Sequence, residues 1–438
     1  MDKPEYIKLK SSNDLPELDE TQFTNLILSF IIKISRAKLF TFALFFIYLN
    51  IVSCSDSASD GDNGPKIGNL EIQVAVSGGD DDPDPFMVLV QGSGSKEIGP
   101  NNSVTFPGIG PGTRTIELTN ISSHCNVIGN NPRQVNVAAD ESFTTEIIEV
   151  QCKAILRNSV IFFRDVPGGI QIYRSHQSGA AAAPVSNLII NRTGLLTNTP
   201  VVSPDGLKIA YCNQGSGYTR TQIYVMDADG SNVVNLTQNN NMTFRTPAWS
   251  PDGSKLVFSG NGNIHVMNAN GTGITTLTNN NSVSDFWPSW SPNGDKIIFE
   301  RTFSDNTIDL YVINPDGTGE EVFLEDRDMN YFNPRWSPDG GKIVFVGQLA
   351  DRDAIRTQQL YTINSNGSNL TNISQESGPE TMNRRGPAWS PSGDRIIFHG
   401  SGAVNTLYTV NSNGLFFTAF FSSSMSAWNP HWSPIIRN

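Results

Sequence analysis

The sequence predicts an all-β protein: a six-bladed β-propeller with C-terminal strand closure, preceded by a small β-sandwich domain. Three observations predict this fold. The 438 residues include 38 glycines and 25 prolines but only 16% charged residues, a composition rich in turns. A Trp-Ser-Pro motif recurs at intervals of 41–53 residues, and short strand-like segments follow each copy. A repeat of about 40–50 residues built from short strands is typical of propellers.

The repeated motif is best preserved in Pro247–Gly253, which reads Pro-Ala-Trp-Ser-Pro-Asp-Gly and leads into the apolar segment Leu256–Phe258. The other copies are Pro200–Gly206, which lacks the tryptophan, Pro288–Gly294, Pro334–Gly340, Pro387–Gly393 and the truncated Pro430–Pro434. A motif with this many copies is expected to serve the scaffold, because every repeat must bury the same face.

A second signature follows the apolar segment in each repeat. Its first copy, Ile223–Gly230, reads Ile-Tyr-Val-Met-Asp-Ala-Asp-Gly. Asp-Gly and Asn-Gly pairs favour the positive φ angles of tight hairpins, and a further strand follows at Val233–Thr237. Each repeat therefore contains four strands, which corresponds to one propeller blade.

The two ends of the repeat region predict how the ring closes. The region opens with a second strand, Ser159–Phe163, and ends with an unmatched first strand, Asn429–Pro434. We expect the C-terminal strand to complete the first blade, because this removes a sheet edge that would otherwise promote aggregation.

The paired motifs resemble the PD-type repeats of TolB propellers, which are related to the propellers of prolyl-oligopeptidase-like enzymes. The resemblance covers residues 156–438 and implies the propeller fold. It carries no ligand or partner with it, because fold alone does not determine function.

The N-terminal residues 1–53 are interpreted as an extension followed by a lipoprotein signal peptide. Lys33, Arg36 and Lys38 precede the apolar run Leu39–Val52, which has the length of a signal peptide. The run leads to Cys54 in a sequence that resembles the bacterial lipobox, which implies that Cys54 carries a diacylglycerol. The alternative is an uncleaved anchor with an incidental cysteine.

A polar tether, residues 54–65, follows the apolar run. Such a segment separates a folded domain from a membrane surface. Ser55 directly after the lipid-bearing cysteine resembles a signal for the outer membrane, on its periplasmic or surface face. The odd feature is the 32 residues before the basic region, which a signal peptide seldom has.

Residues 66–155 are expected to form the β-sandwich. Alternating apolar residues mark the strand Leu70–Val76. Further candidate strands are Phe86–Val90, Ser103–Phe106, Thr113–Leu118, Arg133–Val137 and Phe143–Cys152. The segment Phe106–Leu118 resembles a hairpin of transthyretin/Ig-like modules in bacterial surface proteins.

Two further features of this domain leave alternatives open. In an exported protein Cys125 and Cys152 are expected to pair as a disulfide, and the alternative is two free thiols. The acidic run Asp80–Asp84 could bind calcium or be a solvated loop. The expectation is no cofactor, with calcium possible but without a full motif.

Several function classes lack their signatures. A net charge of −12 argues against nucleic-acid binding. The sequence has no Gly-x-Ser-x-Gly elbow, no P-loop and no dinucleotide fingerprint. Its five histidines show no zinc-ligand spacing. We therefore expect no catalytic residues and no metal site, and we expect Cys212 to be a small buried residue.

A binding surface remains, and propellers bind at the mouth of the central channel. Candidate ligand-binding residues depart from the repeat near the start of the innermost strands. They are Arg245, Phe286, Trp287, Phe332, Asn333, Arg335, Arg384, Arg385, Trp428, Asn429 and His431. The five motif tryptophans are expected to pack between blades, with carbohydrate stacking as the alternative.

The sequence favours a non-catalytic bacterial envelope lipoprotein, a lipid-anchored monomer whose propeller binds an envelope protein or peptide. The first alternative is a glycan-binding surface protein that uses Trp287 and Trp428. The second is a propeller hydrolase or lyase, although the sequence offers no carboxylate or histidine pair that stands out from the repeat.

Overall fold

The computed structural model describes residues 67–78, 85–122, 124–138, 143–180, 182–190, 199–215, 217–239, 241–350, 357–374, 382–401, 406–421 and 426–434. The predicted signal peptide, Cys54, the tether and the acidic run Asp80–Asp84 lie outside these residues. Within them, no helix has the length and apolar character needed to cross a membrane.

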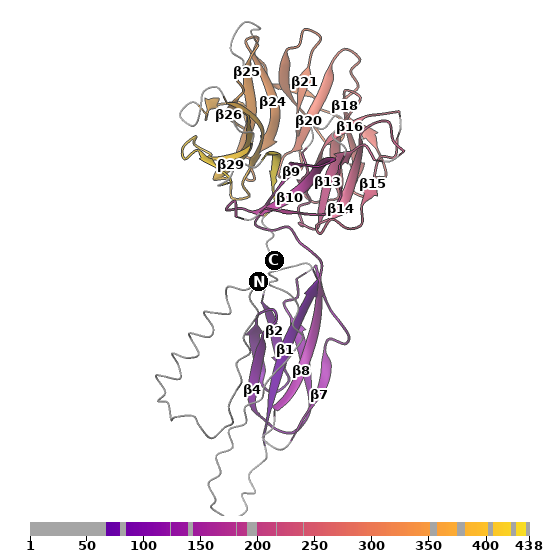
Figure 1. Ribbon diagram of the computed structural model, residues 1–438, viewed down its shortest axis with the longest axis vertical. Helices are drawn as coiled ribbons and strands as arrows, with labels where there is room; N and C mark the ends of the chain where they lie inside the picture. Colours follow the sequence, from indigo (N-terminus) through magenta and orange to yellow (C-terminus); the bar gives the residue numbers. More distant parts are fainter. Residues whose placement is uncertain are drawn as a thin grey trace, which may run out of the picture. The chain divides into compact units, whose positions relative to one another are not determined.

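Six four-stranded antiparallel sheets form the blades in the described part of the chain (Figure 1). Blade 1 contains β9 (Ser159–Val166), β10 (Gly169–His176), β11 (Ala183–Pro184) and β32 (Ala427–Trp432). Blade 2 contains β12 (Val201–Val202), β13 (Lys208–Asn213), β14 (Gln222–Asp227) and β15 (Val234–Asn235). Blade 3 contains β16 (Phe244–Trp249), β17 (Lys255–Gly260), β18 (Asn263–Asn268) and β19 (Thr275–Thr276).

The remaining blades repeat this order. Blade 4 contains β20 (Ser284–Trp290), β21 (Ile297–Thr302), β22 (Ile308–Ile313) and β23 (Glu321–Leu324). Blade 5 contains β24 (Met329–Trp336), β25 (Lys342–Leu349), β26 (Gln359–Asn364) and β27 (Thr371–Asn372). Blade 6 contains β28 (Asn383–Trp389), β29 (Arg395–Ser401), β30 (Thr406–Asn411) and β31 (Thr418–Ala419).

The innermost strands form a closed ring. Each of β12, β16, β20, β24, β28 and β32 contacts the next, and β32 contacts β12. The closing strand β32 pairs with β9, with Trp428 opposite Phe163 and Trp432 opposite Val160. Ser159 and Ser433 add two hydrogen bonds of 2.8 Å. The predicted closure of the first blade by the C-terminal strand is confirmed.

The motif turn explains why serine and aspartate recur after the tryptophan. The Ser250 hydroxyl donates to the Asp252 carboxylate over 2.5 Å and accepts from the amide of Lys255 over 2.9 Å. The Ser254 amide donates to the same carboxylate. Gly253 has a φ of 70°, which glycine adopts without steric cost. The turn therefore joins the first and second strands of a blade in a fixed register.

Five of the six inner strands, all except β12, are interrupted by a bulge just before the motif proline. The residues there are Thr246, Trp287, Asn333, Gly386 and Asn429, whose φ angles lie between 50° and 54°. The register of the inner strand against the second strand shifts at the same place in these five blades. Positive φ is unfavourable for threonine and tryptophan, so the repeated geometry overrides local preference at these positions.

The N-terminal residues form two four-stranded sheets in the described structure. One contains β4 (Ser103–Ile109), β1 (Gly68–Gly78), β8 (Phe143–Cys152) and β6 (Cys125–Val127). The other contains β3 (Gly94–Ile98), β2 (Phe86–Val90), β5 (Gly112–Thr119) and β7 (Arg133–Val137). The six predicted strands are present, and β3 and β6 are additional. Four of the five β3 residues are exposed and β6 has only three residues, so neither shows an alternating apolar pattern.

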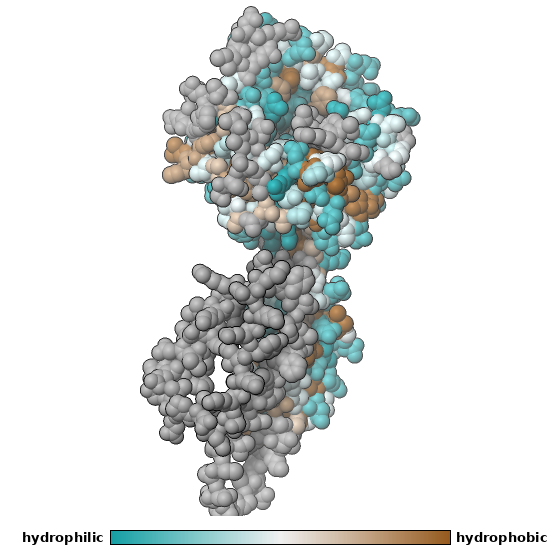
Figure 2. Space-filling model, viewed as in Figure 1, coloured by the Kyte–Doolittle hydropathy of each residue, from teal (hydrophilic) through white to brown (hydrophobic). Residues whose placement is uncertain are grey.

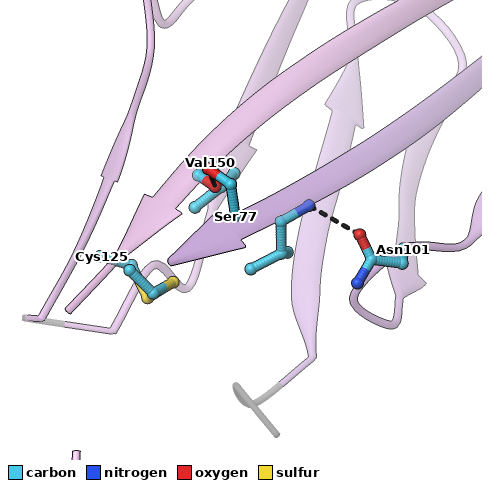
Figure 3. Close-up of a disulfide and its surroundings, with 6 residues drawn as sticks. Ser77, Asn101, Cys125 and Val150 are labelled. Atoms are coloured by element: carbon cyan, nitrogen blue, oxygen red, sulfur yellow. Dashed lines mark hydrogen bonds between the residues drawn. A yellow bond between two sulfur atoms is a disulfide. The ribbon is translucent and has the colours of Figure 1, made fainter. Parts of the chain in front are cut away.

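The sandwich carries the predicted disulfide. Cys125 and Cys152 are opposite residues of β6 and β8, with an S–S distance of 2.01 Å. Figure 3 shows the bond beside Ser77, whose hydroxyl donates to the carbonyl of Val150 at the edge of the hydrogen-bonding range, over 3.4 Å. Both half-cystines are buried, at 5% and 3% exposed. The alternative of two free thiols is therefore wrong.

Several exposed apolar side chains of the propeller lie singly at the outer edges of the blades. Figure 2 shows small brown areas among hydrophilic surface. The exposed residues near the fourth strands include Val234, Ile274, Val322, Leu370 and Phe416. They are spread over different blades, so they form no single apolar platform on the described surface.

Candidate ligand-binding cavity

A cavity of about 460 Å³ opens at the centre of the propeller, at the motif end of the inner strands. All six blades contribute to it through the same motif positions. Its lining consists of Val201, Val202, Pro204, Ala248, Trp249, Ser250, Pro251, Ser289, Trp290, Pro292, Arg335, Trp336, Ser337, Pro338, Ala388, Trp389, Pro391, His431, Trp432, Ser433 and Pro434. The motif thus builds the scaffold and also a largely apolar cavity of a size common for ligand sites.

The residue that follows the first proline of the motif determines whether each blade gives the cavity an apolar or a polar wall. Four blades place the small or apolar residues Val201, Ala248, Ser289 and Ala388 there. Blades 5 and 1 place Arg335 and His431 at the same position. The cavity therefore has one polar side, created by two departures from the repeat, in a ring of otherwise small residues.

The motif tryptophans pack between blades and line the cavity at the same time. The indole Nε1 of Trp249 donates to the carbonyl of Val201 in the preceding blade over 3.2 Å. Trp389 donates in the same way to the carbonyl of Arg335 over 3.1 Å. The indole nitrogens of Trp290, Trp336 and Trp432 are buried and have no partner among the described residues.

Arg335 is held inside the channel by neighbours from two blades. Its guanidinium lies 5.4 Å from the ring centre of Trp287, a cation–π contact. Nη1 donates to the carbonyls of Pro334 and Pro288, over 3.2 and 3.5 Å. Burial lowers the pKa of Arg335 to about 10, and the nearby Glu300 acts in the opposite sense. The side chain stays positively charged at neutral pH.

Glu300 is a buried acid close to Arg335 that the sequence analysis did not single out. It is 6% exposed, and its Oε2 accepts the backbone amide of Asn333 over 2.9 Å. Burial raises the pKa of Glu300 to about 8, although the amide and Arg335 lower it. The carboxyl group is therefore mainly protonated at neutral pH.

A repeat comparison at one further position would have identified Glu300. The residue after the apolar second-strand segment is Phe163, Cys212, Ser259, Glu300, Val346 or His399 in the successive blades. Only one of these residues is a carboxylate, so Glu300 breaks the repeat as clearly as Arg335 does. Cys212 at this position is a buried free thiol, as expected, and burial raises its pKa to about 12.

His431, which lines the cavity, and His399, on the second strand β29, are neutral at physiological pH. Burial and, secondarily, the charge of Arg335 lower the pKa of His431 to about 3. Burial and Arg385 lower the pKa of His399 to about 4. His399 Nε2 is buried without a partner in the described structure. At neutral pH the polar side of the cavity therefore carries the charge of Arg335 alone.

Ten of the eleven predicted ligand-binding residues lie at three successive positions along the inner strands, which we call levels. Arg335 and His431 line the large cavity. Trp287, Asn333 and Asn429 occupy the positive-φ position before the proline. The third level is the residue directly before the positive-φ position, and it holds Arg245, Phe286, Phe332, Arg385 and Trp428. The eleven residues therefore do not form one rim.

The third level lies at the opposite end of the inner strands from the motif turns. Arg245 and Phe286 line a separate small pocket there, of about 150 Å³. Arg385 donates to Gln358 over 2.6 Å. Arg384, the remaining predicted residue, is 1% exposed and donates to Gln359 and the carbonyl of Met382. Its burial leaves it no surface for a ligand.

Trp287 and Trp428 are not exposed aromatic platforms. They are 7% and 9% exposed, and Trp428 belongs to the largest apolar cluster of the propeller. This burial argues against glycan stacking on these two rings, since stacking needs an open ring face.

The described residues contain one group of three side chains close enough to share a metal ion. It consists of His124, Cys125 and Cys152 in the sandwich. Because the two cysteines are joined to each other, their sulfur atoms are not available as thiolate ligands. This group does not form a metal site in the oxidised protein.

Comparisons with known proteins agree with this architecture. The family model of the TolB beta propeller domain matches residues 187–436. TolB from Acinetobacter baumannii is similar in structure, with a TM-score of 0.51 and 19% identity over 64% of this chain and 68% of that chain. A putative TolB from Agrobacterium tumefaciens gives a TM-score of 0.45 and 19% identity, over 63% of this chain and 93% of that chain.

An enzyme is also among the similar structures. An oligogalacturonate lyase in complex with manganese gives a TM-score of 0.41 and 14% identity, over 51% of this chain and 65% of that chain. No curated protein matches the sequence significantly. At identities this low the structural likeness shows the fold alone.

Proposed function

The chain belongs to the TolB beta propeller domain family, and we propose that it is a non-catalytic bacterial envelope lipoprotein whose propeller binds a protein or peptide partner. The observation that carries the proposal is the motif-end cavity. It is built from indole rings, prolines and small residues, which offer a rigid apolar surface, with Arg335 and His431 on one side. Such a surface suits a short apolar stretch of polypeptide.

A binding role fits the titrating groups better than a catalytic role does. Catalysis by a general acid or base needs a group within reach of the substrate and with a pKa near the working pH. His431 lines the cavity, but burial holds its pKa far below neutrality, at about 3. Glu300 has a suitable pKa, but it is 6% exposed and is not among the residues that line the cavity.

The envelope location rests on the N-terminal sequence. The basic region, the apolar run Leu39–Val52, Cys54 and the tether follow one another in the order of a lipoprotein precursor. We propose that the mature protein is a monomer anchored through Cys54 to the outer membrane.

Photo-crosslinking in living cells tests the partner directly. A photoreactive residue at Ala388, inside the cavity, is expected to give a covalent adduct with another polypeptide. The same residue at Thr275, on the exposed outer strand β19, is the matched control and should not give that adduct. Adducts from Ala388 that contain glycan, or identical adducts from both positions, would contradict the proposed function.

A further inference from the structure

Arg335 is half-buried, and no ion pair within the described residues joins it to a carboxylate. Among the residues that line the cavity it is the one with a full charge, and none of them is a carboxylate. Its hydrogen bonds go to two backbone carbonyls, and no ion pair joins it to Glu300 within the described residues. A guanidinium that is partly removed from water gains from an opposite charge, so such groups are commonly paired.

Arg301, one blade earlier, shows how this protein satisfies a buried guanidinium. It is 5% exposed and donates to Asp285 over 2.7 and 2.9 Å and to Glu320 over 2.6 and 3.1 Å. Two carboxylates thus surround Arg301 on a neighbouring strand. Arg335, which is half-buried and lines the cavity, has no such carboxylates around it.

Glu300 does not fill this place at neutral pH. Burial keeps its carboxyl group mainly protonated, and its Oε2 is already bonded to the amide of Asn333. His431, the other polar residue beside Arg335, is also neutral. Arg335 lines the cavity and is only half-buried, so its guanidinium is accessible to an anion that enters there.

We infer that Arg335 forms a carboxylate-binding subsite that captures the C-terminal carboxylate of an apolar partner peptide in the motif-end cavity. This inference rests on the proposed peptide-binding function of the same cavity. A guanidinium can donate two parallel hydrogen bonds to a carboxylate, which adds both affinity and orientation.

The inner wall of the cavity favours a chain end over a chain that passes through. The positive-φ residues lie one level further in; Thr246, Trp287, Gly386 and Asn429 are buried, and Asn333 is half-buried. None of them is part of the cavity lining. A peptide that enters between the prolines therefore meets mostly buried residues at the inner end, and its terminal carboxylate is a group that can reach Arg335 with apolar side chains against the indoles.

Calorimetric titration of the full chain with a matched pair of peptides tests the subsite. The probes are acetyl-Leu-Ala-Leu as the free acid and as the C-terminal amide. The free acid is expected to bind at least about tenfold more tightly, an order consistent with a charge-assisted bond. Arg335→Gln should remove this preference, and Arg245→Gln, at the other end of the channel, should keep it.

A second variant protects the test against a folding defect in Arg335→Gln. Ser289→Asp places a carboxylate on the neighbouring strand of the cavity wall, beside Pro288 whose carbonyl Arg335 already contacts. It should lose the preference for the free acid, and a thermal unfolding curve like that of the wild type shows that the propeller is folded. An acetyl-Leu-Asp-Leu amide should not match the free acid, because its carboxylate lies within the chain.

The outcomes separate the subsite from the function on which it rests. Equal binding of acid and amide by the wild type, or a preference that survives Arg335→Gln and Ser289→Asp, overturns the subsite and leaves peptide binding intact. An equally strong Asp peptide overturns the assignment to a chain end. If neither acetyl-Leu-Ala-Leu probe binds to the wild type, peptide binding in this cavity is contradicted as well.

Discussion

At the residue scale, the candidate ligand-binding residues are those that differ from the repeat motif. The motif residues could be assigned to the scaffold from sequence because every blade contains them. Arg335 and His431 were found as departures from the motif, and the structure places both in the cavity. Glu300 was missed because its significance depends on the neighbouring blade, where Asn333 and Arg335 approach it. Sequence spacing does not show such contacts between blades.

Glu300 should make stability depend on pH. Its pKa is about 8 in the folded protein against an ordinary 4.5. The folded state therefore holds the proton more tightly, so the stabilisation is complete below about pH 4.5 and is lost as the pH rises through 8. Relative to Glu300→Gln, the wild-type free energy of unfolding should fall by up to about 1.4 kcal/mol per pH unit in this window.

Urea unfolding of both proteins at pH 5, 6.5 and 8 measures this difference. His431 is present in both proteins, so its opposite effect, a loss of stability as the pH falls from 6.5 towards 3, cancels in the comparison. Parallel pH profiles for the two proteins would show that Glu300 does not hold its proton in the folded state.

The indole nitrogens of the motif tryptophans should differ in their contribution to the free energy of unfolding. Trp249 donates to Val201, whereas Trp290 is buried without an acceptor in the described structure. Replacement by phenylalanine removes a hydrogen bond in the first case and an unsatisfied donor in the second. Trp249→Phe should therefore be more destabilising than Trp290→Phe, by about 1 kcal/mol. Equal losses in urea unfolding would contradict this assignment.

At the element scale, four strands per repeat and the closing strand followed from the period and from the unequal ends of the repeat region. The bulge before the proline did not, because local preference disfavours positive φ for Thr246 and Trp287. In the sandwich, β3 and β6 were not predicted, because β3 is mostly exposed and β6 is very short, so neither shows an apolar pattern. Ring closure and sheet pairing, which are long-range, decide these features.

Removal of the closing strand should destabilise the propeller strongly. Deletion of residues 429–438 takes away Trp432 and the Ser433 hydrogen bonds, and it leaves β9 with an open edge. The buried tryptophan alone is worth about 3–5 kcal/mol, so the melting temperature should fall far more than after removal of residues 435–438. Similar melting of the two deletion variants would refute the closure.

The disulfide should stabilise the sandwich independently of the propeller. The bond closes a loop with a sequence separation of 27 residues. In the chain-entropy model a loop of this size contributes about 3–4 kcal/mol. The Cys125→Ala/Cys152→Ala double variant should therefore unfold its sandwich at lower urea concentration while the propeller transition is unchanged. An unchanged urea midpoint of the sandwich would contradict a stabilising role of the disulfide.

At the scale of the whole molecule, the sequence assigned the fold and left the ligand open. The family match and the structure of TolB from Acinetobacter baumannii support the propeller. The lipoprotein assignment depends on residues outside the described structure. Cys54→Ala should abolish incorporation of labelled palmitate and release the protein from membranes, whereas Cys212→Ala, at a buried thiol, should leave both unchanged. Persistent labelling of Cys54→Ala would end the lipoprotein proposal.

The seven tryptophans allow a direct test of whether the motif-end cavity binds peptide. Five of them line the cavity, and Trp287 and Trp428 do not. In fluorine NMR of protein labelled with 5-fluorotryptophan, a pool of apolar peptides should shift the signals of Trp249, Trp290, Trp336, Trp389 and Trp432 most. Shifts confined to Trp428, at the opposite end of the inner strands, or no shifts at all, would contradict peptide binding in this cavity.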